Sequence, residues 1–210
     1  MTKSAQLKPR PDLKATVLQI DLTDSRYKTL ADFGARLRTL LDEAKIRSQP
    51  DAVGVIDDLL GAVYSLILAR HHLFDDRINT PIEIDVVQKR AAQIENGDVR
   101  IDGKWIAGWH FNSALFRIAA VFHRLSKLAL GTPSTKDYVP TLLPKVKSLY
   151  RQWTNAEWSS KRVGAIHDEV NTLKHTPQGV HSTRYATFED ALTGVGELVD
   201  LIETWNQNAR

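Results

Sequence analysis

The chain has 210 residues, of which 42% are hydrophobic and 25% are charged, and its formal net charge is +3. These values are typical of one soluble globular domain and exclude disordered and fibrous proteins. The sequence contains no cysteine, which excludes disulfides, a thiol nucleophile and any metal site that needs sulfur. We expect a cytoplasmic protein without a membrane span, because neither a secretion signal nor an apolar run of about 20 residues is present.

The first third of the chain combines an N-terminal arm with two helical patterns. Residues 1–25 form the arm, in which alternating apolar residues at 17–22 predict a short strand. From 26 to 47 and from 51 to 74, apolar residues recur every three or four positions, as they do along a helix. The apolar stripe of the second segment is broad, so we expect this helix to be buried on more than one side.

A third helix, a hairpin and a fourth helix are expected next. Thr80 and Glu83 form a capping box around Pro81, which predicts a helix starting at about residue 80. The dipeptide Asp102-Gly103 is typical of a hairpin turn and predicts a small β-hairpin near residues 97–106. A further apolar periodicity predicts a helix over residues 109–130.

Three more helices are expected in the C-terminal part. A proline-containing connection leads into a short helix around Val146–Trp153, and Thr154 with Glu157 forms a capping box that predicts a helix up to His175. The last helix is expected after Thr187. We therefore predict an all-α protein: one helical-bundle domain over residues 26–210, with six or seven helices and the small hairpin.

Positive charge is concentrated in the middle of the chain. From Arg117 to Arg162 there are nine lysines and arginines against two acidic residues, whereas the segment after Thr187 is acidic. If these cations share one face, a polyanion such as RNA can bind there; the alternative is that they are solvated faces of several helices. The candidate RNA-binding residues are Arg117, Arg124, Lys127, Lys145, Lys147, Arg151, Lys161 and Lys174.

A second candidate site lies on the helix that is expected to end at His175. His167, Asn171 and His175 are spaced by four, which places them on one face, opposite an apolar stripe. Histidine transfers protons near neutral pH and asparagine can hold a substrate oxygen, so this face suits a cleft or a subunit interface. Alternatively, Asn171 is simply exposed and His175 interacts with the last carbonyl groups of its helix.

The run Val170-Asn171-Thr172-Leu173-Lys174-His175 resembles the motif helix of the HEPN superfamily of helical-bundle proteins. That motif is an arginine, a polar residue directly after it, and a histidine four to six residues further on. Active members are metal-independent ribonucleases, usually homodimers with the motif at the subunit interface, found in toxin–antitoxin and phage-defence systems. Asn171 and His175 match the polar and histidine positions, and Val170 occupies the arginine position.

The resemblance implies cleavage of RNA by its own 2′-hydroxyl group without a cofactor. His175 would transfer the proton, with Asn171 and His167 beside it. The electrostatic role of the missing arginine would pass to Arg162, to Lys174 or to an arginine of a partner subunit. Without such a replacement, we expect an inactive protein that only binds RNA.

Two further groups of residues have both a functional and a structural interpretation. Aromatic residues at Trp109 and Phe116 beside Arg117 and Arg124 could stack on RNA bases, or they could be core aromatics with arginines reaching out to solvent. The pairs His71/Asp75 and His72/Asp76 could hold a metal with a third ligand, or the histidines could favour the end of their helix.

From the sequence we expect a HEPN-like helical protein that binds or cleaves RNA in a bacterial-type defence or regulatory setting. The competing hypothesis is a non-catalytic module that docks on a partner protein. A metal-dependent hydrolase built on His71 and His72 is the third.

Overall fold

The computed structural model describes residues 20–46, 49–72, 103–132, 139–175 and 186–208. All regular secondary structure in these segments is helical, which confirms the predicted all-α class. The elements are η1 (Ser25–Tyr27), α1 (Lys28–Ile46), α2 (Pro50–His72), α4 (Gly103–Ala129), α5 (Val139–Thr154), α6 (Lys161–His175) and α7 (Phe188–Asn208). The predicted helix starting at about residue 80 and the arm up to residue 19 lie outside the described residues.

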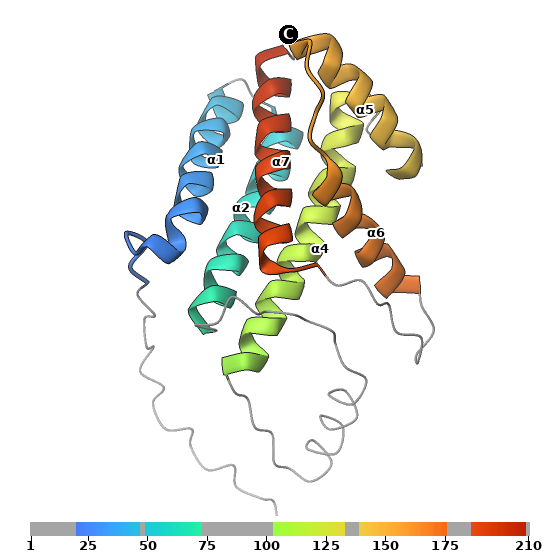
Figure 1. The fold of residues 1–210 in the computed structure, drawn as a ribbon. Coiled ribbons are helices and arrows are strands. Elements are labelled where there is room, and N and C mark those ends of the chain that lie inside the picture. The colour runs from blue at the N-terminus through green and yellow to red at the C-terminus, as the bar shows by residue number, and fades with distance from the viewer. Residues whose placement is uncertain (1–19, 47–48, 73–102, 133–138, 176–185, 209–210) are drawn as a thin grey trace, which may run out of the picture.

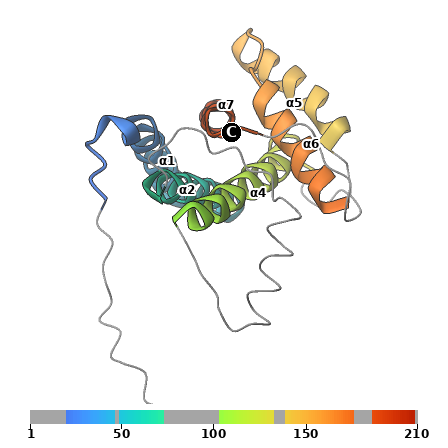
Figure 2. The same cartoon turned by 60° about the horizontal axis from the view of Figure 1, so that its bottom comes forward.

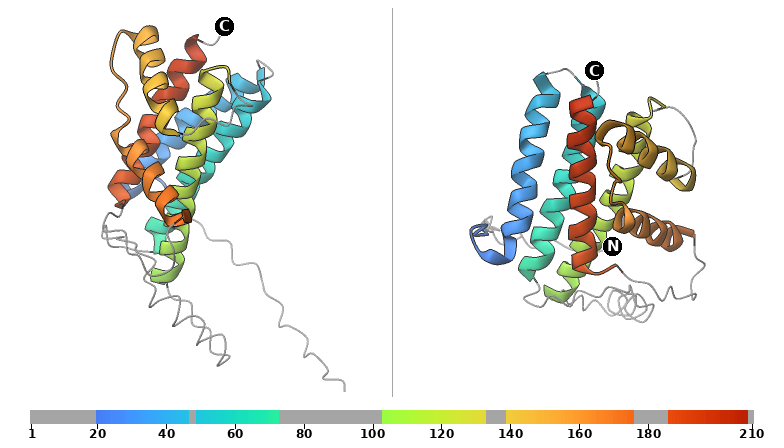
Figure 3. Two further views of the ribbon diagram at one scale, coloured as in Figure 1. Left: turned by 90° about the vertical axis from the view of Figure 1, so that its right-hand side faces the viewer. Right: turned by 45° about the horizontal axis from the view of Figure 1, so that its top comes forward.

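The last helix in the chain lies at the centre of the bundle. α7 contacts α1, α2, α4, α5 and α6, and Figure 1 shows it between α1 on one side and α6 on the other. Figure 2 shows α7 on one side of the pair formed by α2 and α4. α5 and α6 lie beside α4, on the opposite side of the bundle from α1 (Figure 3). The outer surfaces of α2 and α4 therefore remain on the face away from α7.

The core follows from the apolar periodicity of α2, α4 and α7. As the broad stripe of α2 predicts, this helix is buried on more than one side. The largest fully buried side chains of α2 and α4 are Leu59, Leu66, Phe111, Ile118, Phe122 and Leu125. They belong to one continuous cluster together with buried residues of α1, α6 and α7. The described helices therefore share one core.

The start of α7 agrees with the sequence. The hydroxyl of Thr187 accepts a hydrogen bond from the backbone N–H of Asp190 at 3.1 Å. In return, the Asp190 carboxylate accepts from the backbone N–H of Thr187 at 2.9 Å. This reciprocal pair satisfies two backbone donors at the start of the helix, so α7 begins directly after Thr187.

Two expected β segments are wrong where the structure describes them. Residues 104–106, the second arm of the expected hairpin, lie with Gly103 in the first turn of α4, and residues 97–102 lie outside the described part. The helix extends to Gly103 because Ala107 is buried on the same face as Phe111 and Ala114, so core packing continues the helical period. Residues 20–22 form no strand: Ile20 packs on the core, whereas Leu22 is exposed.

The start of α6 was also predicted incorrectly. Thr154 ends α5 instead of capping α6: its hydroxyl donates to the carbonyl of Tyr150 at 2.9 Å and accepts from the N–H of Ala156 at 3.2 Å. α6 begins only at Lys161. The intervening segment buries Trp158, whose indole N–H donates to the Glu197 carbonyl at 2.9 Å. Burial of this large ring and its hydrogen bond outweigh the local capping signal.

Candidate functional site

One segment of α6 resembles the HEPN motif. In this segment, the residue that corresponds to the arginine of the motif is Val170, which lies in the core. Val170 is only 2% exposed and belongs to the central cluster with Val163 and Ile166. An arginine at this place would bring its charge among apolar side chains, at a high desolvation cost. Asn171, the next residue, is exposed. Position 170 therefore serves packing, and the two adjacent motif positions do not share a surface.

The structure does not bring Arg162 to the other predicted catalytic residues. Arg162 lies at the start of α6, and its guanidinium is 3.0 Å from the Asp190 carboxylate of α7. Asn171 lies nine residues further along α6, about 14 Å at the helical rise. Within one copy of the chain Arg162 is therefore paired with Asp190 and distant from Asn171, and its catalytic role stays a prediction. His175 ends α6, and its side chain and that of Lys174 lie outside the described ones.

His167 packs inside the protein instead of facing a cleft. Its side chain is largely buried, and its ring meets the ring of Phe122 edge to face with centroids 6.3 Å apart. Its Nδ1 atom lies 3.5 Å from the carboxylate of Asp168. Because Phe122 is fully buried, these contacts give His167 a packing role. Of His167, Asn171 and His175, which were expected to share one face, Asn171 alone has a described side chain that is exposed.

The acidic residues of α7 are used inside the fold. Asp200 and Glu203 both bind Arg36 of α1, at 2.8 and 2.7 Å. The hydrogen bonds that Arg36 donates to Glu203 and Asp200 raise the pKa of Arg36 above its ordinary value. Together with the Asp190–Arg162 pair, these contacts tie α7 to its neighbours on both sides. Asp190, Asp200 and Glu203 of α7 therefore contribute their charge to contacts between helices.

Positive charge remains on α4 and α5. Neither helix contains an aspartate or a glutamate. Their seven lysines and arginines are Lys104, Arg117, Arg124, Lys127, Lys145, Lys147 and Arg151. On α5, the side chains of Lys145, Lys147 and Arg151 are exposed, and Lys161 at the start of α6 is exposed as well. The structure therefore supports an outward-facing cationic surface on α5.

The two arginines of α4 lie along α2 and share one acid. The guanidinium groups of Arg117 and Arg124 both contact the carboxylate of Asp58, Arg117 at 3.5 Å. They lie over Gly61 and Gly54, which leave room on α2 because they lack side chains. Two cations facing one carboxylate keep a net positive charge, and both arginines are only half-buried. Sequence reasoning placed these arginines on one face but missed their acidic partner.

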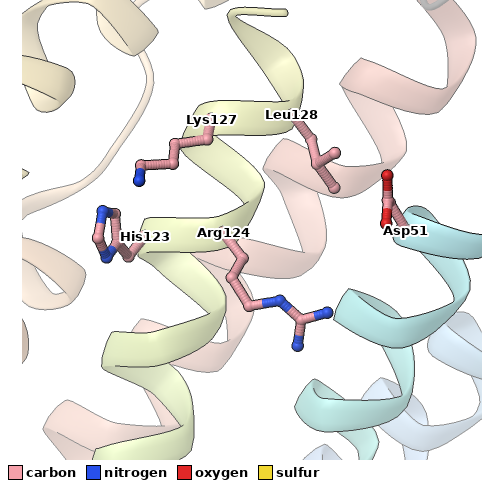
Figure 4. A pocket seen from close by; sticks show the side chains of 5 residues that line it. All are labelled: Asp51, His123, Arg124, Lys127 and Leu128. Carbon is pink, nitrogen blue, oxygen red and sulfur yellow. The ribbon is translucent and has the colours of Figure 1, made fainter. Parts of the chain in front are cut away.

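A small pocket lies where the end of α4 meets the start of α2. It has a volume of about 230 Å³ and is lined by Asp51, His123, Arg124, Lys127 and Leu128. Figure 4 shows Arg124 and Leu128 projecting toward the side of Asp51, whereas His123 and Lys127 project from the other side of α4. Basic groups therefore face outward on both flanks of the C-terminal half of α4.

Large aromatic side chains are exposed on the outer surface of α2 and α4. Trp109 is 71% exposed, Tyr64 is 63% exposed and Phe116 is 37% exposed. The interpretation of Trp109 and Phe116 as core aromatics is therefore wrong for these two positions. Solvent-facing rings of this size mark binding surfaces more often than scattered aliphatic residues do.

Histidines gather at the end of α2 and the beginning of α4. The ring of His72 stacks on that of His110, with centroids 6.2 Å apart and planes 9° apart, and His71 lies 5.4 Å from His72. Burial lowers the pKa of His72 and of His110; repulsion from His71 lowers the pKa of His72 further, and repulsion from His72 lowers the pKa of His110 further. The described residues contain no group of three possible ligands that could hold a metal. Asp75 and Asp76 lie outside the described part.

One described helix has the length and apolar composition of a membrane span. This helix is α2, in which an 18-residue window has a mean hydropathy of 1.8, and 56% of that window is buried in the bundle. The core helix of a soluble protein has the same properties. The absence of a membrane span stays a prediction.

No protein-family model matches the chain, and neither does any curated protein or solved structure. The resemblance to the HEPN motif therefore stays a prediction.

Proposed function

We propose that the protein is a HEPN-like helical protein that binds RNA through α4 and α5 and does not cleave it. The observation that supports RNA binding is that these two neighbouring helices carry seven cations and no acidic residue. Such a concentration of lysine and arginine attracts a polyanion, because each phosphate contact releases counterions. In this proposal the protein acts in the cytoplasm, as a homodimer, in a defence, toxin–antitoxin or regulatory setting.

The proposed function does not include RNA cleavage, because Val170 is buried. A HEPN-type ribonuclease needs a cation near the scissile phosphate, and Val170 lies in the core while Arg162 is held by Asp190. In the described part of α6, no arginine lies beside Asn171. The likeness of residues 170–175 to the HEPN motif remains the reason for choosing RNA among polyanions.

Binding is tested by fluorescence anisotropy with labelled RNA at 50 and 200 mM salt. We expect affinity that falls steeply with salt. The double variant Lys147→Gln/Arg151→Gln of α5 should weaken binding and reduce the salt slope by about 1 to 1.5, since each phosphate contact contributes about 0.7 on a single strand. The charge-matched control Lys28→Gln/Arg38→Gln changes two exposed cations of α1 and should leave the slope unchanged.

Cleavage is tested separately, by incubating labelled RNA with the protein in EDTA. We expect intact RNA. Cleavage that disappears in His175→Ala would overturn the non-catalytic part of the proposal and identify His175 as the proton-transfer residue.

A second candidate function is docking on a partner protein, and the exposed rings of Tyr64, Trp109 and Phe116 favour it. This function predicts no RNA affinity even at low salt. The two functions are therefore separated by the anisotropy measurement.

A further inference from the structure

We propose that the RNA is single-stranded and that its bases stack on three exposed aromatic side chains of α2 and α4. These side chains, Tyr64, Trp109 and Phe116, are called the aromatic strip. The inference rests on the proposed function and adds the kind of RNA that is bound. Single-stranded nucleic acids are held by aromatic rings on which bases stack and by cations that follow the phosphates, and the outer surface of α2 and α4 offers both.

Two of the three aromatic residues share one side of α4, and the third lies at a similar level on α2. Trp109 and Phe116 are seven residues apart in α4, two helical turns, so they project on the same side about 10 Å apart along the axis. α2 and α4 are antiparallel, because Gly61 meets Arg117 while Gly54 meets Arg124. Tyr64, one turn beyond Gly61, therefore lies at the level of the α4 turn that contains Phe116.

Cations continue this surface along the same helix. Arg117 directly follows Phe116, and Arg124 and Lys127 come two and three turns later. Arg117 and Arg124 share the one carboxylate of Asp58, which leaves one positive charge uncompensated between them. From Trp109 to Lys127 the surface extends over 18 residues, about 27 Å. This length suits a short single-strand site on the order of four nucleotides.

Stacking distinguishes single strands from duplexes. In a double helix the base faces are covered by neighbouring base pairs, and proteins recognise duplex RNA mainly through its shape, its phosphates and its 2′-hydroxyl groups. A surface that carried cations only would bind both forms through their phosphates. Exposed rings beside the cations add an interaction that only unpaired bases can make.

The experiment compares a labelled 12-nucleotide single strand with a 12-base-pair duplex RNA, both titrated with the full chain at one salt concentration. We expect tighter binding of the single strand. Trp109→Ala should weaken single-strand binding at least about fivefold, since one lost base–aromatic stack has an effect of this order or larger. Trp109→Phe should restore most of the affinity, and neither change should alter duplex binding.

The matched control is Leu22→Ala, which removes an exposed apolar side chain outside α2 and α4 and should leave both affinities unchanged. Equal binding of single strand and duplex, both insensitive to Trp109→Ala, would overturn this inference and leave the proposed RNA binding intact. If neither RNA binds at low salt, both proposals fail, and the aromatic strip is then better explained as a protein-docking surface.

Discussion

The guanidinium of Arg124 lies over the backbone of Gly54, so closely that a β-carbon at Gly54 would stand 2.9 Å from its Nη2 atom. The same relationship is repeated one heptad away, where Gly61 lies under Arg117. Asp58 lies between the two glycines and binds both arginines. The two arginines are seven residues apart in α4, and the two glycines that they cover are seven residues apart in α2. The arginines are held in place by the fold, yet they keep half of their surface in solvent.

A different glycine permits close packing in the core, and we predict that Gly194→Ala destabilises the protein by about 1 to 3 kcal/mol. A β-carbon there would stand 2.8 Å from Cδ1 of Ile166, which is itself buried. The matched control is Gly34→Ala in α1, where no atom lies within 4 Å of the new carbon. It should stabilise the protein by up to about 1 kcal/mol through helix propensity. Urea denaturation measures both; destabilisation of equal size in the two variants would contradict the prediction.

The sequence predicts the helices well where periodicity and local chemistry agree. α7 starts after Thr187 as expected, because its capping partner Asp190 lies three residues away. The start of α6 could not be predicted in this way, because the groups that determine it are distant in sequence. Glu197 lies 35 residues after Arg162, and no local pattern connects them.

The same limit applies to the candidate site. Helical spacing correctly placed Val170 beside Ile166 on an apolar stripe, and the resemblance named it as the arginine position. What the sequence could not provide is the identity of the facing groups: Asp190 for Arg162, Phe122 for His167 and Asp58 for Arg124. These partners come from other helices and depend on how the bundle packs. The exposure of Trp109 depends in the same way on which face of α4 the core covers.

The buried carboxylate of Glu197 caps α6 from α7, and we predict that Glu197→Ala destabilises the protein by about 2 to 3 kcal/mol. Glu197 is 5% exposed, and it accepts from the backbone N–H groups of Arg162 and Val163 at 3.1 and 2.8 Å. Without it, these first donors of α6 lose their partner. Glu197→Gln keeps one acceptor oxygen and should therefore destabilise the protein less than Glu197→Ala.

The control for Glu197 is Glu157→Ala, an exposed residue in the segment between α5 and α6, which should change stability by less than about 0.5 kcal/mol. Denaturation monitored by circular dichroism provides the comparison. A Glu197→Ala variant as stable as Glu157→Ala would show that the cap does not hold α6.

The stacked rings of His72 and His110 should make the free energy of unfolding depend on pH. Burial lowers the pKa of both histidines, so the folded state favours their neutral form. Below about pH 6.5 the unfolded chain takes up protons that the folded protein does not, and stability falls until the lowered pKa values are passed. We therefore predict a lower denaturation midpoint at pH 5 than at pH 7.5.

The histidine contribution is isolated by His110→Gln, which cannot be protonated and should reduce the difference between the two pH values. The unsubstituted protein is the reference for this difference. An unchanged pH difference in His110→Gln would assign the acid sensitivity to other groups. Glu169 is not one of them, because burial raises its pKa, so the folded state binds this proton more tightly and gains stability in acid.

An arginine at position 170, where the HEPN-like resemblance places one, should destabilise this fold instead of creating a nuclease. Val170 is packed with Val163 and Ile166, so Val170→Arg buries an unpaired charge and should destabilise the protein by about 3 kcal/mol or more. Asn171→Arg, one position later on the exposed side, introduces the same residue and should change stability by less than about 0.5 kcal/mol. Thermal unfolding and RNA cleavage in EDTA are measured for both variants. A stable Val170→Arg protein that cleaves RNA would show that position 170 can reach the surface, and would return the chain to the catalytic form of the family that it resembles.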